Sequence, residues 1–261
     1  MSLKDILGEY PGRFIILGRD TNADEHDVVV YGITGRSESS QARTIECDEI
    51  NKVMFTKPTN PEVLAKGIQN LLIYSAIMET DEGIAVSNGY QTNWIYSFMK
   101  NYGNNITPTQ ALEASLKSDF FVYDTETKKF LNVTSYEPDE PNFTPRISGC
   151  IKKGSGAFHI VRKEDGEFNR YFWPVKLKKG EGRSISTYTG VNENPLPSFK
   201  GLPLEVKILG ETPTEIAESV YKALAPEEGK KDFRVSVAVL MKSIKTGESC
   251  YNIINRHEKG E

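Results

Sequence analysis

Val28-Val29-Val30-Tyr31-Gly32-Ile33 is the apolar run that sets the fold class. A shorter apolar run, Phe14-Ile15-Ile16-Leu17, precedes it and is bounded by Pro11-Gly12 and by Gly18. Short apolar runs between turn-forming residues are typical of buried strands. Two such runs in succession predict an antiparallel hairpin, the simplest connection between neighbouring strands.

The same pattern recurs along the chain, interrupted by helices. Further strands are predicted at 44–47, 84–87, 147–151, 157–161, 168–175, 185–188, 233–240 and 249–254. Helices are predicted at 92–102, from 107 onward and at 212–224. Thr92, Thr107 and Thr212 each supply a capping hydroxyl at the predicted helix start. The apolar run 71–78 fits either a strand or the end of a helix that begins near Pro61.

The order of these elements predicts the fold class. Strands that pair with their sequence neighbours fit an α+β domain, with antiparallel sheets covered by helices, better than parallel β-α-β winding. No internal repeat, low-complexity linker or charge block divides the chain. We therefore expect one domain over residues 1–261, with a polar, irregular insertion around 163–201.

The composition is that of an ordinary globular protein. Of the 261 residues, 38% are hydrophobic and 26% are charged, and the formal net charge is −4. Because nucleic acids and membrane surfaces attract basic proteins, we expect neither as a partner. Cys47, Cys150 and Cys250 are too scattered for a disulfide framework, and the three histidines stand alone. This favours a cytoplasmic protein with reduced thiols and no metal.

The segment Gly35-Arg36-Ser37-Glu38-Ser39-Ser40-Gln41-Ala42-Arg43 follows the first predicted hairpin. It gathers three serines and two arginines within nine residues. These groups suit a phosphate or a planar anion, because Arg is always charged and offers a forked set of donors. The alternative is a polar surface loop without a ligand.

A second distinctive segment, Tyr136-Glu137-Pro138-Asp139-Glu140-Pro141-Asn142-Phe143-Thr144-Pro145-Arg146, is rich in proline and acid. Its three prolines forbid a helix and hold the chain in an extended path. Its carboxylates are either solvated acids of a surface loop or candidates for acid–base chemistry.

Four motifs occur in order: Tyr10-Pro11-Gly12-Arg13-Phe14, the 35–43 segment, Val86-Ser87-Asn88-Gly89 with Thr92, and Thr144-Pro145-Arg146-Ile147. Together they resemble the archaeal-type inosine monophosphate (IMP) cyclohydrolases and their bacterial relatives. The resemblance implies a four-layer αββα sandwich like that of the N-terminal nucleophile hydrolases, with a deep pocket between the sheets. It also implies ring closure of 5-formamidoimidazole-4-carboxamide ribonucleotide to IMP and water in purine biosynthesis. The family needs no cofactor, and its archaeal members are tetramers, so we expect a homo-oligomer.

The resemblance further implies the catalytic residues. The arginine of the family matches Arg43, and its glutamate matches Glu137, with Glu140 as a rival. Tyr74 is similar to a tyrosine of the family pocket. In ring closure Glu137 would take a proton from the attacking carboxamide nitrogen, and Arg43 would stabilise the oxygen that becomes negative. Candidate substrate-binding residues are Arg36, Ser37, Ser39, Asn88, Gly89, Thr92 and Arg146.

The chain departs from the family pattern at Gly32, where the archaeal members have an arginine. The contact made by that arginine is either lost here or supplied by another basic residue, such as Arg13 or Arg146. A change of this kind keeps open a purine-nucleotide-binding protein that has the same fold but no catalysis.

Two other functions are also open. An amidohydrolase acting on another small amide would need Cys, Ser or Thr exposed at the start of the first strand. Arg13-Phe14 occupies that position, and Ser2 lies well before it. An unrelated α+β scaffold would instead let the arginines at 36, 43 and 146 point apart into solvent.

Overall fold

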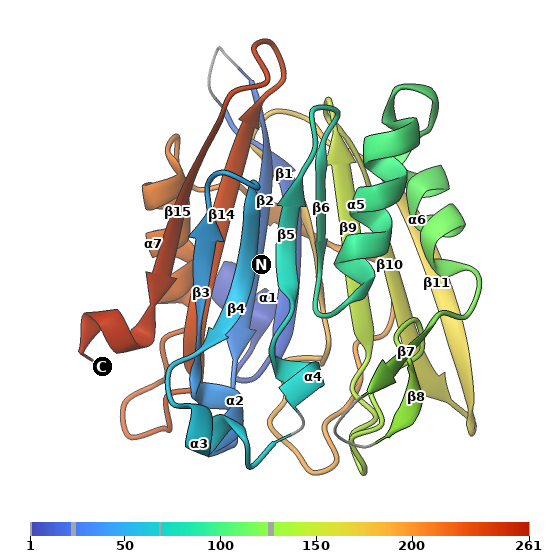
Figure 1. Ribbon diagram of the computed structural model, residues 1–261. Coiled ribbons are helices and arrows are strands. Elements are labelled where there is room, and N and C mark those ends of the chain that lie inside the picture. The colour runs from blue at the N-terminus through green and yellow to red at the C-terminus, as the bar shows by residue number, and fades with distance from the viewer. Residues whose placement is uncertain (1, 22–24, 68, 125–127, 261) are drawn as a thin grey trace.

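Two large antiparallel sheets form the protein in the computed structural model, which describes residues 2–21, 25–67, 69–124 and 128–260 (Figure 1). The six-stranded sheet has the order β13 (Leu204–Lys207), β12 (Glu181–Ser186), β1 (Arg13–Arg19), β2 (His26–Thr34), β14 (Arg234–Ser243) and β15 (Ser249–Asn255). The seven-stranded sheet has the order β11 (Glu167–Lys176), β10 (Ser155–Glu164), β9 (Arg146–Lys152), β6 (Ile84–Ser87), β5 (Ser75–Glu79), β4 (Val53–Pro58) and β3 (Arg43–Asp48). A small hairpin, β7 (Phe121–Asp124) with β8 (Lys129–Asn132), stands apart from both.

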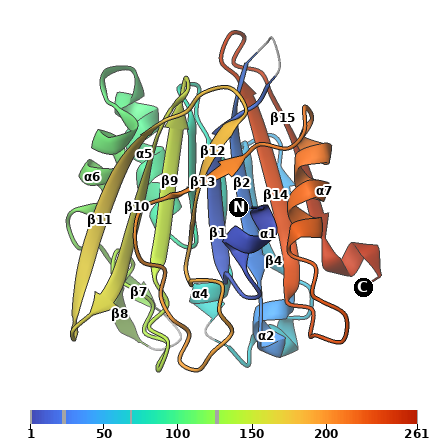
Figure 2. The ribbon, with the colours of Figure 1, turned by 180° about the vertical axis from the view of Figure 1, so that it is seen from behind.

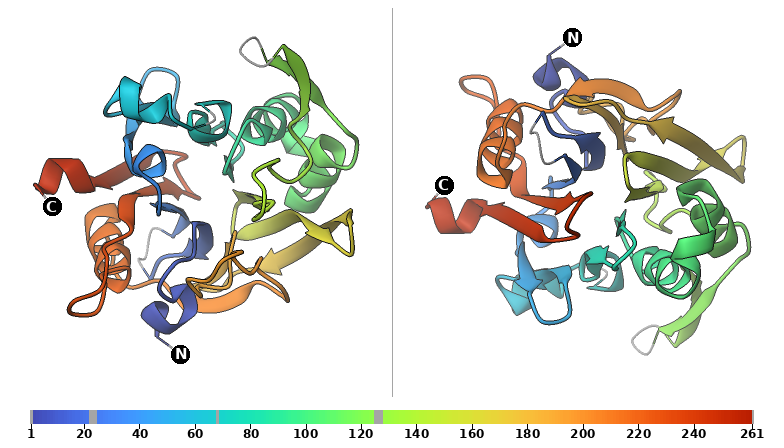
Figure 3. Two further views of the ribbon diagram at one scale, coloured as in Figure 1. Left: turned by 90° about the horizontal axis from the view of Figure 1, so that it is seen from below. Right: turned by 90° about the horizontal axis from the view of Figure 1, so that it is seen from above.

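Helices cover the outer face of each sheet, and the two inner faces pack on each other (Figures 2 and 3). Helices α1 (Leu3–Leu7) and α7 (Pro213–Ala223) lie on the six-stranded sheet, and α5 (Gln91–Tyr102) and α6 (Pro108–Leu116) lie on the seven-stranded sheet. The predicted α+β class with helix-covered antiparallel sheets is therefore confirmed. None of the described helices is long and apolar enough to cross a membrane.

The apolar run in β2 is continuous because both of its faces are buried. Val29, Tyr31 and Ile33 face the core between the sheets. Val28 and Val30 face the second core, under α1 and α7. A strand buried on both faces loses the alternation of polar and apolar residues that a half-exposed strand shows. The predicted hairpin with β1 is confirmed, with Ile15 opposite Tyr31.

Two of the three predicted capping threonines are confirmed. Thr107 and Thr212 each begin a helix with a capping box, with Pro at the first helical position. The prediction for Thr92 is wrong, because α5 starts at Gln91 after Tyr90, which makes no side-chain cap. The hydroxyl of Thr92 instead donates to the carbonyl oxygen of Gly89 at 3.0 Å and bonds Ser87.

Short helices connect the strands near one end of the sandwich. They are α2 (Glu38–Gln41), α3 (Pro61–Leu64) and α4 (Gln69–Leu72), while two 3₁₀ turns lie elsewhere at Gly103–Asn105 and Arg256–Lys259. The run 71–78, which fitted helix or strand, contains the end of α4 and most of β5. Both interpretations therefore hold for part of it.

The first part of the segment 163–201 is regular, because it contains β11 and β12. Residues 187–201 are irregular as expected and form only isolated bridges. Strand β12 lies inside the six-stranded sheet, paired with β1 on one side and β13 on the other. Its Gly182 is tightly packed, since a Cβ there would lie 2.9 Å from Val206 and 3.0 Å from Ile208. Close packing of this kind requires small residues such as glycine, and glycine is also frequent in loops, so the sequence of this strand resembles that of a loop.

Gly32 is required by the ring of Phe14, which lies directly opposite it. A Cβ at position 32 would lie 2.0 Å from Cζ of Phe14. We expect Gly32→Ala to push this ring out of the second core and lower the free energy of unfolding by about 1–3 kcal/mol. Urea unfolding followed by circular dichroism measures the change. Gly149→Ala is the matched control, since its Cβ would meet no described atom closer than 3.3 Å, and an equal loss in both variants would contradict the explanation.

Candidate functional site

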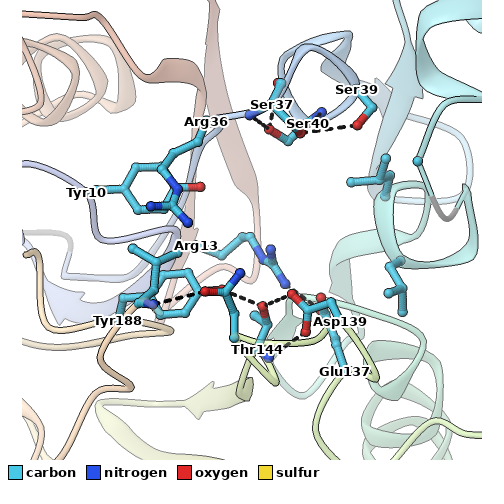
Figure 4. Close-up of a pocket in the computed structure, with 15 residues that line it drawn as sticks. Tyr10, Arg13, Arg36, Ser37, Ser39, Ser40, Glu137, Asp139, Thr144 and Tyr188 are labelled. Carbon is cyan, nitrogen blue, oxygen red and sulfur yellow. Dashed lines mark hydrogen bonds and ion pairs between the residues drawn. The ribbon is translucent and has the colours of Figure 1, made fainter. Parts of the chain in front are cut away.

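A cavity of about 440 Å³ opens at one end of the sandwich (Figure 4). The end of β2, the starts of β1 and β9 and the end of β12 meet there, because neighbouring antiparallel strands run in opposite directions. The lining residues come from five segments of the chain: Tyr10, Arg13, Arg36, Ser37, Ser39, Ser40, Gly67, Leu71, Leu72, Glu137, Asp139, Asn142, Thr144, Tyr188 and Leu196. The 35–43 segment and the acidic 136–146 segment, which are distant in sequence, therefore form opposite walls of one site.

The acidic segment is folded back on itself, which fixes Glu137 in the wall. The backbone N–H of Glu137 donates to the carbonyl oxygen of Thr144 at 2.8 Å. The backbone N–H of Thr144 in turn donates to Oδ1 of Asp139 at 2.6 Å. As predicted, no helix or strand forms between Tyr136 and Pro145. Glu140 is exposed and does not line the cavity, so the geometry favours Glu137 over its rival.

The carboxylate of Glu137 is 3% exposed and its described contacts all reach one oxygen, Oε1. Nη2 of Arg13 forms an ion pair with Oε1, Nδ2 of Asn88 donates to it at 3.5 Å, and Nη1 of Arg146 lies 3.9 Å away. Among the described residues none bonds Oε2, which leaves that oxygen for a ligand. Burial raises the pKa of Glu137 above its usual range, while the charges of Arg13 and Arg146 oppose the shift.

Arg43 does not touch Glu137, although it lies close behind the cavity. It is fully buried, its Nε donates to the carbonyl oxygen of Ser40 at 3.1 Å, and its Nη1 donates to that of Leu72 at 3.2 Å. Both of these partners line the cavity. Its Nη2 has no hydrogen-bond partner in the described part of the chain. Arg43 therefore braces the wall and adds positive charge behind it.

Arg36, Ser37 and Ser39 lie across the cavity from Glu137 and Asp139. Nη1 of Arg36 donates to the carbonyl oxygen of Glu193 at 2.8 Å, and its guanidinium lies 5.3 Å from the ring centre of Tyr10. The hydroxyl of Ser37 accepts from the backbone N–H of Ser40 and so caps α2. These three candidates are brought together as the sequence suggested.

Tyr74, Asn88 and Thr92 support the wall from behind and do not line the cavity. The hydroxyl of Tyr74 lies 2.7 Å from that of Tyr31, in the core between the sheets. Oδ1 of Asn88 accepts from the backbone N–H of Ile147 at 2.8 Å and its Nδ2 donates to the carbonyl oxygen of Pro145 at 3.0 Å, which ties β6 to the start of β9.

Gly89 has a different part, because it makes room for Arg146. A Cβ at position 89 would lie 2.4 Å from Nη1 of Arg146. The guanidinium of Arg146 is buried, and it reaches Glu137 only because Gly89 has no side chain.

The sequence candidates left out several lining residues, among them Tyr10, Thr144 and Tyr188. Tyr10 and Thr144 belong to motifs quoted above, but as tyrosine and threonine they carried no distinctive chemical signal. Tyr188 lies in the segment expected to be an insertion. Only the pairing of β12 with β1 brings it to the cavity.

The charges around the cavity do not balance. Arg13, Arg36 and two carboxylates, Glu137 and Asp139, line it, while Arg43 and Arg146 lie directly behind. Four guanidinium groups, two lining the cavity and two behind it, are near two carboxylates, which leaves an excess of two positive charges on a chain of net charge −4. A dianion of suitable size would neutralise this excess. The part of the chain that the structure describes holds no group of three His, Cys, Asp or Glu residues that could bind a metal ion.

Gly89→Ala should separate Arg146 from Glu137. Because Arg146 lowers the pKa of Glu137, we expect that pKa to rise further in the variant. Carbon-13 NMR titration of the glutamate carboxyl groups measures it, and Glu137→Gln identifies the signal by its loss. An unchanged titration in Gly89→Ala would contradict the assigned role of the glycine.

One family model, described as IMP cyclohydrolase-like protein, matches residues 10–247. The matched range includes every residue that lines the cavity. No curated protein matches the chain.

Proposed function

The chain belongs to the IMP cyclohydrolase-like family, and we propose that it is an IMP cyclohydrolase. It would close the purine ring of 5-formamidoimidazole-4-carboxamide ribonucleotide and release IMP and water. The helix–sheet–sheet–helix order supports the further proposal that the fold is related to that of the N-terminal nucleophile hydrolases.

The observation that carries the proposal is the charge of the cavity. The substrate is a phosphate monoester, which is close to a dianion at neutral pH, and the cavity has an excess of two positive charges. Arg36, Ser37 and Ser39 lie on the wall opposite Glu137 and suit the phosphate. Arg43 would attract the phosphate through its field, since its unpartnered Nη2 carries charge that no described carboxylate neutralises.

Ring closure then takes place at the other wall. The carboxamide nitrogen attacks the formyl carbon, both groups being attached to one imidazole, so most of the entropic cost is already met. Oε2 of Glu137 takes one proton from the nitrogen as the C–N bond forms, and this proton passes to the former formyl oxygen to give a hydroxyl. The formamido nitrogen then loses its proton, the hydroxyl leaves as water with that proton, and the C=N bond forms.

The oxygen of the formyl group carries negative charge while the C–N bond forms. Arg13 and Arg146 are better situated than Arg43 to stabilise that charge, because both already lie beside Glu137. The sequence resemblance assigned this part to Arg43, whose Nε and Nη1 donate to backbone carbonyls. Arg13 and Arg146 would also supply the contact missing at Gly32.

Purified protein mixed with the formamido ribonucleotide should produce the hypoxanthine absorbance of IMP. Glu137→Gln should lower kcat by at least about a hundredfold, because the base is lost while the shape is kept. Glu140→Gln is the matched control, an exposed neighbour on the same loop, and should keep full activity. Binding of IMP without turnover by the folded wild-type protein would instead establish a nucleotide-binding protein.

The pH dependence follows from the raised pKa of Glu137. The base acts in its ionised form, so kcat/KM should fall as pH is lowered through this pKa. The midpoint should lie above the usual glutamate value of about 4.3. A rate profile measured from pH 4 to pH 8 tests this, and a flat profile over that range would contradict the role of Glu137.

A further inference from the structure

Tyr188 lines the cavity, and its hydroxyl bonds that of Thr144, another lining residue. Its ring stacks on that of Tyr10 with 5.9 Å between the ring centres. On another side it lies against Gly12, where a Cβ would be 2.6 Å from Cδ2 of Tyr188. Gly12 has a φ of +72°, a conformation that glycine adopts without strain. The position of this hydroxyl is therefore fixed before any ligand arrives.

The direction of its hydrogen bond can be worked out from the neighbours. The carboxylate of Asp139 can only accept, and its Oδ2 takes the hydroxyl hydrogen of Thr144. A threonine hydroxyl has a single hydrogen, so Oγ1 of Thr144 can only accept from the hydroxyl of Tyr188. The hydrogen of Tyr188 is thus committed to Thr144. What remains for the cavity is the phenol oxygen as an acceptor.

We propose that Tyr188 is a specificity residue whose oxygen accepts a hydrogen bond from the N–H that the reacting amide nitrogen keeps. This inference rests on the proposed function. The carboxamide nitrogen begins with two hydrogens, of which ring closure removes one. Glu137 takes the hydrogen that leaves, and Tyr188 holds the one that stays and becomes the N1–H of the hypoxanthine ring. Asp139 and Thr144 act through Tyr188 as positioning residues.

Holding that N–H also orients the attack. An amide nitrogen with one hydrogen on Glu137 and the other on Tyr188 has its plane fixed, so that its lone pair can be directed at the formyl carbon. Tyr188 does not compete as a base, because burial raises its pKa further above the ordinary tyrosine value. It remains a neutral phenol throughout.

A single isosteric substitution reverses the direction of the hydrogen bonds that connect Asp139, Thr144 and Tyr188. In Asp139→Asn the amide oxygen still accepts from the backbone N–H of Thr144, and the new NH₂ group donates to Oγ1 of Thr144. Among the described partners of Oγ1, only the hydroxyl of Tyr188 is then left to accept the hydrogen of Thr144, so Thr144 donates to Tyr188. The hydrogen of Tyr188 is released to the cavity, and the residue changes from an acceptor to a donor.

Two purine monophosphates serve as probes, measured by calorimetry with the full chain. IMP has an N1–H donor, and adenosine monophosphate (AMP) has an N1 acceptor. We expect the wild type to prefer IMP, and Asp139→Asn to shift the Kd ratio toward AMP by roughly tenfold or more. Tyr188→Phe should reduce the preference in both backgrounds to the same value. The lost negative charge in Asp139→Asn strengthens both complexes alike and cancels in the ratio.

The outcomes separate this inference from the proposed function. A folded wild type that binds neither IMP nor the formamido ribonucleotide overturns both. Binding of IMP with a Kd ratio that neither Asp139→Asn nor Tyr188→Phe changes overturns only the role of Tyr188. Glu140→Gln is again the control on the same loop and should leave the ratio unchanged. If Asp139→Asn does not fold, Tyr188→Phe alone decides, because an unchanged ratio in that variant is sufficient to reject the proposal.

Discussion

The buried ion pair between Arg13 and Glu137 connects the two halves of the molecule. Arg13 begins β1 in the six-stranded sheet, and Glu137 lies on the segment that leads into β9 of the seven-stranded sheet. Removal of one partner from such a pair leaves an unpaired buried charge, which costs several kcal/mol, about 3–5 in comparable cases. The pair therefore holds the two sheets together at the end of the sandwich where the cavity opens, and the shape of the cavity depends on this contact.

The same pair shows how stability and chemistry are balanced at this site. Burial opposes ionisation of Glu137, and two guanidinium groups favour it. Because every described contact reaches Oε1, the structure uses one oxygen to anchor the carboxylate and keeps the other free. An anchored but incompletely used carboxylate is what general base catalysis requires.

Sequence reasoning succeeded where the cause is local. The starts at Thr107 and Thr212 were predictable because a cap and a proline act within one turn. The hairpin of β1 and β2 was predictable because both runs are close in sequence and strongly apolar. Strand β12 was predicted only at its end, by the run 185–188, since its Gly182 reflects a packing partner, Ile208, that only the sheet brings near. The same limit applies to the site. Both the 35–43 and the 136–146 segments could be identified from the sequence. Whether Arg43 or Arg13 pairs with Glu137 depends on the direction in which each side chain leaves its strand, which the sequence does not give.

The pairing of β1 with β12 also has a consequence for biosynthesis. Phe14 lies opposite Ser186, so one edge of the first long strand has no neighbour until more than two thirds of the polypeptide has left the ribosome. An apolar strand with free backbone groups is a template for pairing with other molecules. Contacts this distant in sequence also slow the search for the native topology. The nascent hairpin of β1 and β2 therefore has free edges that favour aggregation, on β1 until β12 emerges and on β2 until β14 emerges.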